Sequence, residues 1–285
     1  MRLVLVTLAM LLNLGDVQGG PVFYSINVQS GDDELVTVDA ATGQVVTIGS
    51  LGPSVQLEFP SLAVANGRLF LVNPTTAAGP VELLELSPST GAILSSTQIT
   101  LAGNTIPLVE SIDSTGGQLV ISYGLTSGGG TGTRSNRIGT LELNGTITDS
   151  VTLSASDDLD GIAVDQQGQF FGADASSPNV GSDILTISLN PPATTLLATI
   201  GSTETDILDL SFTDTDLLFG LDVMGGLQRR IHQINPLTGE SLNSVPIDPI
   251  WTLRGLTFVP EPTALILATC AILGLVGYGC RRHGR

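Results

Sequence analysis

The sequence predicts an all-β fold, a five-bladed β-propeller whose closing blade is assembled from both ends of the body. Between the two chain ends, short runs of β-branched and apolar residues alternate with Gly, Pro, Asn and Asp. No segment of this body shows the 3.6-residue periodicity of an amphipathic helix. A strand–turn–strand unit also recurs at a nearly constant spacing, and such repeats are typical of propellers and solenoids.

The turns of this unit lie at residues 43, 91, 145, 192 and 239, separated by 48, 54, 47 and 47 residues. Four of them have glycine at that position, and the fourth copy has Asn190-Pro191-Pro192 instead. A second pair of strands precedes each of the last four units. Two of these pairs align without gaps, Phe171-Gly172-x-Asp174 against Phe219-Gly220-x-Asp222. Each repeat therefore holds four strands, as a propeller blade does.

The repeats give four continuous blades near residues 54–103, 104–156, 157–202 and 203–249. The first unit lacks an innermost strand, and the segment Arg254-Gly-Leu-Thr-Phe258 matches the missing one. We expect residues 250–259 and 20–53 to form one composite blade, because this pairing closes the ring and removes exposed sheet edges. An open β-solenoid and a β-sandwich are the alternative folds.

The N-terminus has the features of a secretory signal peptide over residues 1–19. Arg2 is followed by an apolar run from Leu3 to Leu14, which is too short to span a bilayer. Val17 and Gly19 supply small residues at the −3 and −1 positions of a cleavage site. We expect residues 20–259 to be the exported domain.

The C-terminus, residues 260–285, predicts one transmembrane helix. The 18 residues from Thr263 to Cys280 carry no charge. At 1.5 Å per residue they make about 27 Å of helix, close to the thickness of the hydrocarbon layer. Arg281 and Arg282 follow directly, so the positive-inside rule places that end in the cytoplasm and the upstream body outside.

Pro260, Glu261 and Pro262, followed by this apolar span and the stop at Arg281 and Arg282, resemble the PEP-CTERM sorting signal of Gram-negative bacteria. The resemblance covers residues 259–285. It implies recognition by a membrane-embedded exosortase, inner-membrane anchoring before processing, and a final place at the cell surface or outside the cell. It also implies an organism that makes exopolysaccharide. An ordinary tail anchor is the alternative.

The composition bounds the partners. The chain has ten Arg, no Lys and 27 acidic residues, for a net charge of −17. Nucleic acid is excluded as a partner, because no basic patch is present to neutralise phosphates. Both Cys residues, Cys270 and Cys280, lie in the C-terminal segment, so the body has neither a disulfide nor a Cys-ligated metal.

The blade pattern is similar to that of quinoprotein-like and gluconolactonase-like propellers, with strands such as Gly161-Ile-Ala-Val-Asp165 followed by turns. The resemblance extends to the blade alone, and no catalytic set transfers with it. The body contains one histidine, His232, which we expect to be packed or solvated, so a Ser-His-Asp site is poorly supported. We expect Trp251 to be a core residue of the closing blade, with a sugar-stacking surface as the alternative.

Carboxylates recur where loops enter the innermost strands, near the expected channel mouth. If they converge, they could hold Ca²⁺ through oxygen ligands, although solvated loop acids are the interpretation we favour. The candidates are Glu58, Glu110, Asp158, Asp160, Asp206 and Asp209. No catalytic residue is predicted, and no cofactor other than this possible Ca²⁺.

The sequence therefore favours an exported, exosortase-sorted surface or matrix protein with a non-enzymatic binding or structural role, associated with extracellular polysaccharide. The alternative is a carbohydrate-active or lactonase-like propeller enzyme that uses a divalent cation at the channel mouth. A protein-interaction platform is a third hypothesis. Carboxylates converging within reach of one metal would favour the enzyme.

Overall fold

The computed structural model describes residues 20–28, 32–52, 57, 60–73, 80–106, 108–125, 135–154, 158–174, 181–201, 205–223 and 229–259. The predicted signal peptide, the C-terminal segment with its sorting motif, and Glu58 lie outside these residues. The described part consists of strands and turns. It contains no helix of the length and apolarity that a membrane crossing requires.

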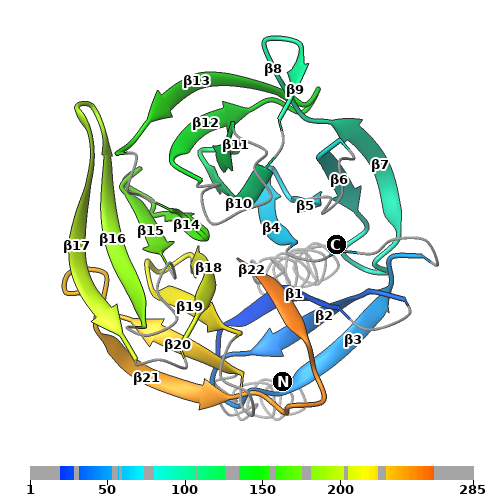
Figure 1. Cartoon of the computed structure of the whole chain (residues 1–285). Coiled ribbons are helices and arrows are strands. Elements are labelled where there is room, and N and C mark those ends of the chain that lie inside the picture. Colours follow the sequence, from blue (N-terminus) through cyan, green and yellow to red (C-terminus); the bar gives the residue numbers. More distant parts are fainter. Residues whose placement is uncertain are drawn as a thin grey trace, which may run out of the picture.

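The strands form five sheets around a central axis, which confirms the predicted five-bladed propeller (Figure 1). Four sheets, each from its innermost strand outward, are β4 (Ser61–Ala65), β5 (Arg68–Asn73), β6 (Glu82–Leu86) and β7 (Ile93–Gln98); β10 (Leu108–Thr115), β11 (Gln118–Gly124), β12 (Arg137–Leu141) and β13 (Thr146–Thr152); β14 (Gly161–Val164), β15 (Phe170–Asp174), β16 (Ser182–Leu189) and β17 (Pro192–Ile200); and β18 (Ile207–Phe212), β19 (Leu218–Asp222), β20 (Arg230–Ile234) and β21 (Ser241–Pro246).

The fifth sheet is the composite blade. Its strands, again from the axis outward, are β22 (Leu253–Phe258), β1 (Val22–Asn27), β2 (Glu34–Asp39) and β3 (Val45–Ser50). β22 pairs antiparallel with β1, with Phe23 opposite Phe258. The two ends of the body thus close the ring as expected, and the innermost strands contact one another in the closed order β4, β10, β14, β18, β22 and β4.

The hydrophobic core is divided among the five interfaces between neighbouring blades. Each of the five buried clusters contains residues from two adjacent sheets, such as Phe23 and Val36 of the composite blade with Phe219 and Leu221 of the blade before it. The alternation predicted from the sequence reflects this arrangement, because each sheet is covered on both faces by its neighbours.

The recurring glycine turn is explained by contact between blades. At Gly91, whose φ is +74°, an added Cβ would lie 2.5 Å from the carbonyl oxygen of Gly49 on β3 of the preceding blade. The turn glycines at 43, 145 and 239 approach the outer strands β21, β7 and β17 in the same way. The period of the sequence repeat is therefore set by one close approach per blade.

One boundary differs from the expected one. β8 (Thr100–Leu101) and β9 (Asn104–Thr105) form a hairpin, and β8 pairs in parallel with β13 of the next blade. The Thr100 amide donates to the Gly145 carbonyl at 2.8 Å. The predicted division after residue 103 falls inside this hairpin, because the chain extends the next blade's outer edge before it returns to the axis.

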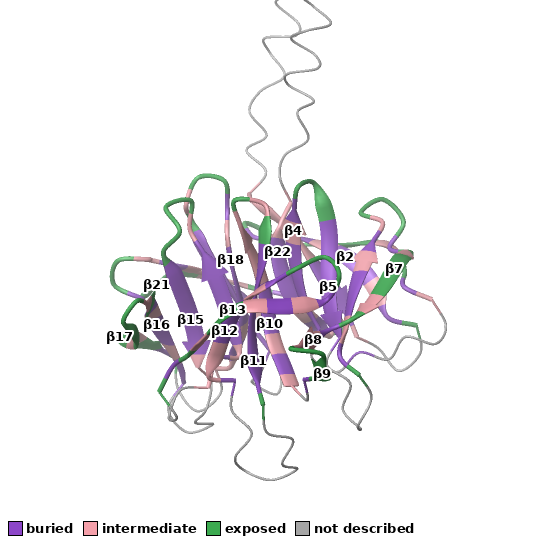
Figure 2. Ribbon diagram, turned by 90° about the horizontal axis from the view of Figure 1, so that it is seen from above, coloured by how far each residue is buried: buried purple, intermediate pink, exposed green. Residues whose placement is uncertain are grey.

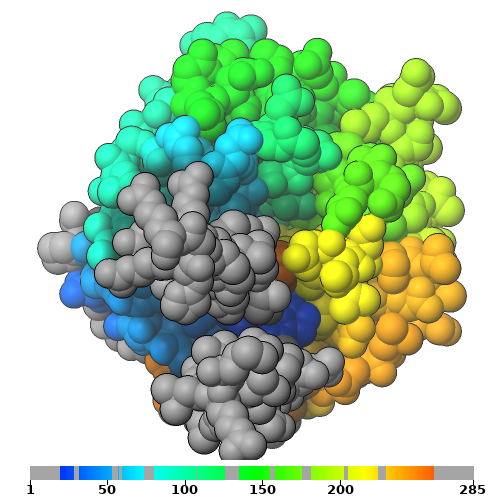
Figure 3. Space-filling view, turned by 180° about the vertical axis from the view of Figure 1, so that it is seen from behind, coloured from blue at the N-terminus to red at the C-terminus, as the bar shows by residue number. Residues whose placement is uncertain are grey.

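The disc has two distinct faces (Figure 2). On the turn face, short turns follow the innermost strands β4, β10, β14 and β18, and β22 ends at Phe258. On the loop face, longer connections lead into the same strands. β1 begins on the turn face beside the end of β22, so both ends of the body leave from that face. Figure 3 views the turn face, where the blades follow one another in chain order.

Candidate functional site

The axis of the propeller is closed by a ring of five positions, one on each innermost strand: Ser61, Ser111, Gly161, Asp209 and Gly255. Asp209 is the only charged residue of the ring, and it is 1% exposed. An added Cβ at Gly161 would lie 2.9 Å from the Asp209 Cα, so glycine is needed there for the two strands to approach. Asp209 was expected at the mouth of the channel, but it lies inside.

The Asp209 carboxyl group joins four of the innermost strands. Its Oδ1 accepts from the Ser111 hydroxyl at 3.1 Å and from the Leu210 amide at 3.0 Å. Its Oδ2 accepts from the Ser61 hydroxyl and the Leu256 amide, both at 2.9 Å. Burial raises the pKa of Asp209 well above its usual range, and these donors oppose that rise.

A common rule explains this network. An innermost strand has no further partner on its axial edge, so its outward amides need other acceptors. Side chains of the preceding blade supply them. The Ile112 and Ile162 amides donate to the hydroxyls of Ser61 and Ser111, both at 3.1 Å, as the Leu256 amide donates to Asp209. Short polar side chains on innermost strands therefore hold adjacent blades together.

The rule continues at the next ring toward the turn face. The Val164 amide donates to Asp113 Oδ2 at 2.7 Å, and the Phe258 amide donates to the Ser211 hydroxyl at 3.0 Å. Thr257 occupies the equivalent position on β22 and accepts no such amide, although it is only 4% exposed. Its hydroxyl makes no hydrogen bond to any residue that the structure describes.

This second ring forms the floor of a cavity of about 260 Å³ that opens on the turn face. All five innermost strands contribute to its wall. The polar part of the wall holds three carboxyl groups and several hydroxyls, and the apolar part is made by two valines and two phenylalanines. The lining side chains that matter below are Asp113, Asp165, Asp214, Thr257, Phe212 and Phe258.

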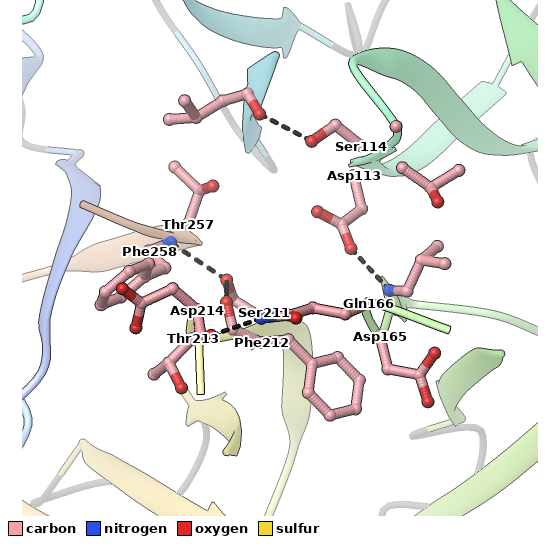
Figure 4. A pocket seen from close by; sticks show the side chains of 14 residues that line it. Asp113, Ser114, Asp165, Gln166, Ser211, Phe212, Thr213, Asp214, Thr257 and Phe258 are labelled. Atoms are coloured by element: carbon pink, nitrogen blue, oxygen red, sulfur yellow. Dashed lines mark hydrogen bonds between the residues drawn. The ribbon is translucent and has the colours of Figure 1, made fainter. Parts of the chain in front are cut away.

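Asp113 is the carboxyl group that faces the cavity (Figure 4). One of its oxygens accepts from Val164, and the other turns toward the open space, on the side where the Thr257 hydroxyl points. Burial raises the pKa of Asp113 to about 7, against the opposing effect of the Ser114 and Val164 amides. Asp165 is different, because its Oδ1 accepts the Gln167 and Gln169 amides of its own turn, at 2.9 and 2.7 Å.

The predicted mouth acids gather on the loop face. Glu110, Asp158 and Asp160 interact electrostatically. Burial, followed by the charges of Asp160 and Asp158, raises the pKa of Glu110 to about 8. The Asp158 Oδ1 is already engaged, since it accepts the Ser135 amide at 2.9 Å. Among the described residues, no three acidic or His side chains are placed to hold one metal ion, so the expected Ca²⁺ geometry is not found in that part of the chain.

Asp206 lies apart from those three and close to two arginines. Burial raises its pKa to about 6, while the charge of Arg254 opposes the rise and that of Asp222 adds to it. Burial also lowers the pKa of Arg254, and Arg229 lowers it further. Arg229 donates to the Trp251 carbonyl at 2.6 Å. The loop face thus carries opposite charges on two sides of the axis.

The repeated aspartates at the ends of β15 and β19 have a structural role. The Asp158 amide donates to Asp174 Oδ2 at 3.4 Å, and the Asp206 amide donates to Asp222 Oδ1 at 3.0 Å. Each aspartate holds the segment that enters its own blade's innermost strand. This shared contact explains why the two blades align without gaps.

His232 and Trp251 are placed as the sequence suggested. His232 is 7% exposed, and its Nδ1 lies 3.0 Å from the Ser241 hydroxyl, while its Nε2 lies 3.6 Å from Asp222. Trp251 is partly buried against the core between the composite blade and its neighbour. Neither side chain lines the turn-face cavity.

Sequence reasoning did not identify Asp113 and Thr257 as site residues. The signal was present in the alternation of the innermost strands, where the residue two positions after each ring member faces the same way. Those positions are 63, 113, 163, 211 and 257, and only three of them are polar. Register along the strand, and not acidity alone, selects the residues that face the axis.

No protein-family model matches the chain, and a search of curated proteins gives no match. Solved structures share its fold at low identity. One is a PQQ-bound aldose sugar dehydrogenase from Streptomyces coelicolor, with 12% identity, 82% of this chain and 84% of that chain covered, and a TM-score of 0.49.

Two other solved structures are similar to the same degree. TolB from Acinetobacter baumannii has 12% identity over 85% of this chain and 67% of its own, with a TM-score of 0.49. A nidogen/laminin complex has 12% identity over 83% and 98%, with a TM-score of 0.48. At this identity the likenesses concern the fold and say nothing about the chemistry of the cavity.

Proposed function

We propose that this chain is an exported binding protein, without enzymatic activity, that holds an extracellular polysaccharide in the turn-face cavity of its propeller. One observation carries the proposal: a preformed cavity on the axis, lined by hydroxyls, carboxyls and two aromatic rings from all five innermost strands. Concave sites with a few convergent polar groups on an apolar wall are typical of small-ligand binding.

The chain ends support the exported location. The signal-like residues 1–19 and the PEP-CTERM-like residues 260–285 flank the body in the sequence. Both described ends of the body lie on the turn face, and Phe258, at the end of β22, lines the cavity. An anchor that follows residue 259 therefore begins beside the cavity, and exosortase processing would separate the binding face from the membrane.

Thermal unfolding of the full-length chain against a panel of polysaccharides tests the binding. A ligand that binds the native state raises the melting temperature by mass action. We expect a rise with at least one polysaccharide, and a flat response to the whole panel would contradict the proposal.

Sorting is tested separately in a Gram-negative host that has an exosortase. We expect the intact chain at the cell surface or in the medium, and a chain with Pro260, Glu261 and Pro262 replaced by alanine in the inner-membrane fraction. Equal distribution of the two chains would remove the sorting signal from the account.

A second candidate function rests on the loop face. The electrostatic proximity of Glu110 to Asp158 and Asp160 favours a propeller enzyme with a divalent cation there. Such a cation would lower the pKa of Glu110 and raise the melting temperature. A rise with Ca²⁺ that EDTA reverses, and that Glu110→Gln abolishes, would support this candidate over the first.

A further inference from the structure

The turn-face cavity carries a charge pattern that narrows its ligand. Three of its lining residues are carboxylic acids, Asp113, Asp165 and Asp214, and none is Arg, Lys or His. The whole chain has a net charge of −17. An anionic sugar such as a uronate would be repelled from such a site, whereas a cationic ligand is attracted to it.

The polar groups that are free to bind are few and well placed. Asp165 is engaged by its own turn, and Ser114 donates to the Val64 carbonyl at 2.6 Å. Ser211 accepts the Phe258 amide. The remaining groups are the second oxygen of Asp113 and the buried hydroxyl of Thr257, which point into the same space (Figure 4). Both can accept a hydrogen bond.

A protonated primary amine fits these two acceptors. An ammonium group has three donors and no acceptor, so it can donate to Asp113 and Thr257 together and still donate to the rim. The bond to a carboxylate is charge-assisted and stronger than a neutral one. Phe212 and Phe258 offer an apolar wall to the carbon skeleton that carries the amine.

We propose that the turn-face cavity binds the free amine of a hexosamine unit, with Asp113 and Thr257 as its direct ligands. The inference rests on the proposed function, because it names the polysaccharide class: one with unacetylated amino sugars. The cavity of about 260 Å³ has room for a single sugar ring and leaves the rest of a polymer outside. Acetylation would remove both the positive charge and two of the three amine donors.

Three trisaccharides test the inference by calorimetry on the full-length chain at pH 7: the β-1,4 glucosamine trimer, its fully N-acetylated form, and cellotriose. We expect the glucosamine trimer to bind and the other two to bind at least tenfold more weakly, the loss of one charge-assisted hydrogen bond. Equal binding of all three would overturn the amine inference and leave the polysaccharide function standing. Binding of none would contradict both.

Variants locate the site. Asp113→Asn keeps an acceptor for the Val164 amide and should weaken binding of the glucosamine trimer about tenfold or more. Thr257→Val should weaken it, and Thr257→Ser should restore it. Glu110→Gln, on the opposite face, is the matched control for charge and should bind as the unaltered chain does. If Asp113→Asn and Glu110→Gln bind alike, the attraction comes from net charge and the cavity is not the site.

Discussion

The two faces of the propeller differ in how their connections are made. On the turn face, two to five residues join most successive strands, and asparagine, aspartate and glycine close the turns. On the loop face, most of the connections are longer and carry the acidic residues Glu110, Asp158 and Asp206 into the innermost strands. Short turns fix the positions of adjacent strands closely, so the turn face can present a preformed cavity.

The comparison also separates two uses of carboxyl groups. Asp209 and Asp113 accept amides from neighbouring strands and take part in the closure of the ring. Glu110 faces other carboxyl groups across the loop-face mouth, and repulsion and burial raise its pKa together. A carboxyl group near a propeller axis can thus hold blades together or wait for a ligand. The predictions below distinguish these uses.

The largest effect is expected from Asp209→Ala. The substitution leaves the Ser61 and Ser111 hydroxyls and the Leu256 amide without their acceptor in a buried site. Each unsatisfied buried group costs about 1–3 kcal/mol, so we expect a loss of about 3 kcal/mol or more in the free energy of unfolding. Urea unfolding measures it. Asp209→Asn, which keeps one acceptor, should lose less, and Glu142→Ala on the exposed surface should be nearly neutral. Equal losses for Asp209→Ala and Glu142→Ala would contradict the closure role.

The next effect tests the contact between blades at the outer turns. Gly91 and Gly67 have nearly the same φ, +74° and +73°, but only Gly91 approaches a neighbouring blade. Gly67→Ala should cost about 1 kcal/mol from backbone strain alone. Gly91→Ala should cost about 2–3 kcal/mol, because its Cβ would also collide with the Gly49 carbonyl. If thermal unfolding gives the same loss for both, the contact does not explain the repeat.

A smaller effect concerns pH. Glu110, Asp113 and Asp206 have pKa values near 8, 7 and 6 in the folded chain, above those of unfolded carboxyl groups. The folded chain therefore holds more protons than the unfolded chain between about pH 4 and 8, and its stability should fall as the pH rises through that range.

Glu110→Gln should reduce this slope by an amount of the order of 2 kcal/mol between pH 5 and pH 8.5. Unfolding at a series of pH values measures it, with the exposed Glu142→Gln as the control. A slope that Glu110→Gln leaves unchanged would show that other groups dominate the linkage.

The smallest effect on stability is expected from Asp113→Asn. The amide oxygen can replace the carboxylate as acceptor for Val164, so the free energy of unfolding at pH 6 should change by about 0.5 kcal/mol or less. A loss above 2 kcal/mol would mean that Asp113 serves the fold and not a ligand. The same variant then has a large effect on binding and a small one on folding, the reverse of Asp209→Ala.

Much of the fold follows from the sequence. The glycine turns at a regular spacing, the paired Asp174 and Asp222, and the lone strand before Val259 led to five blades and to the closure between β22 and β1. The hairpin of β8 and β9 was missed, because two-residue strands have no periodicity to detect.

The site was less predictable for a physical reason. Acidity selected Glu110, Asp158 and Asp160, which do share one mouth, but it placed Asp209 there as well. A bulge in the pairing of β18 with β19, between Ile207 and Asp209, shifts the strand's facing by one residue. Bulges leave no reliable mark in the sequence, so the facing of Asp209 and the cavity above it depend on the three-dimensional register.

The most direct test of the account is a crystal structure of the chain with the glucosamine trimer. The account predicts one sugar ring in the turn-face cavity, with its amine within hydrogen-bond distance of Asp113 and Thr257. An empty cavity beside a sugar bound at the loop face, or no bound sugar at saturating concentration, would contradict it.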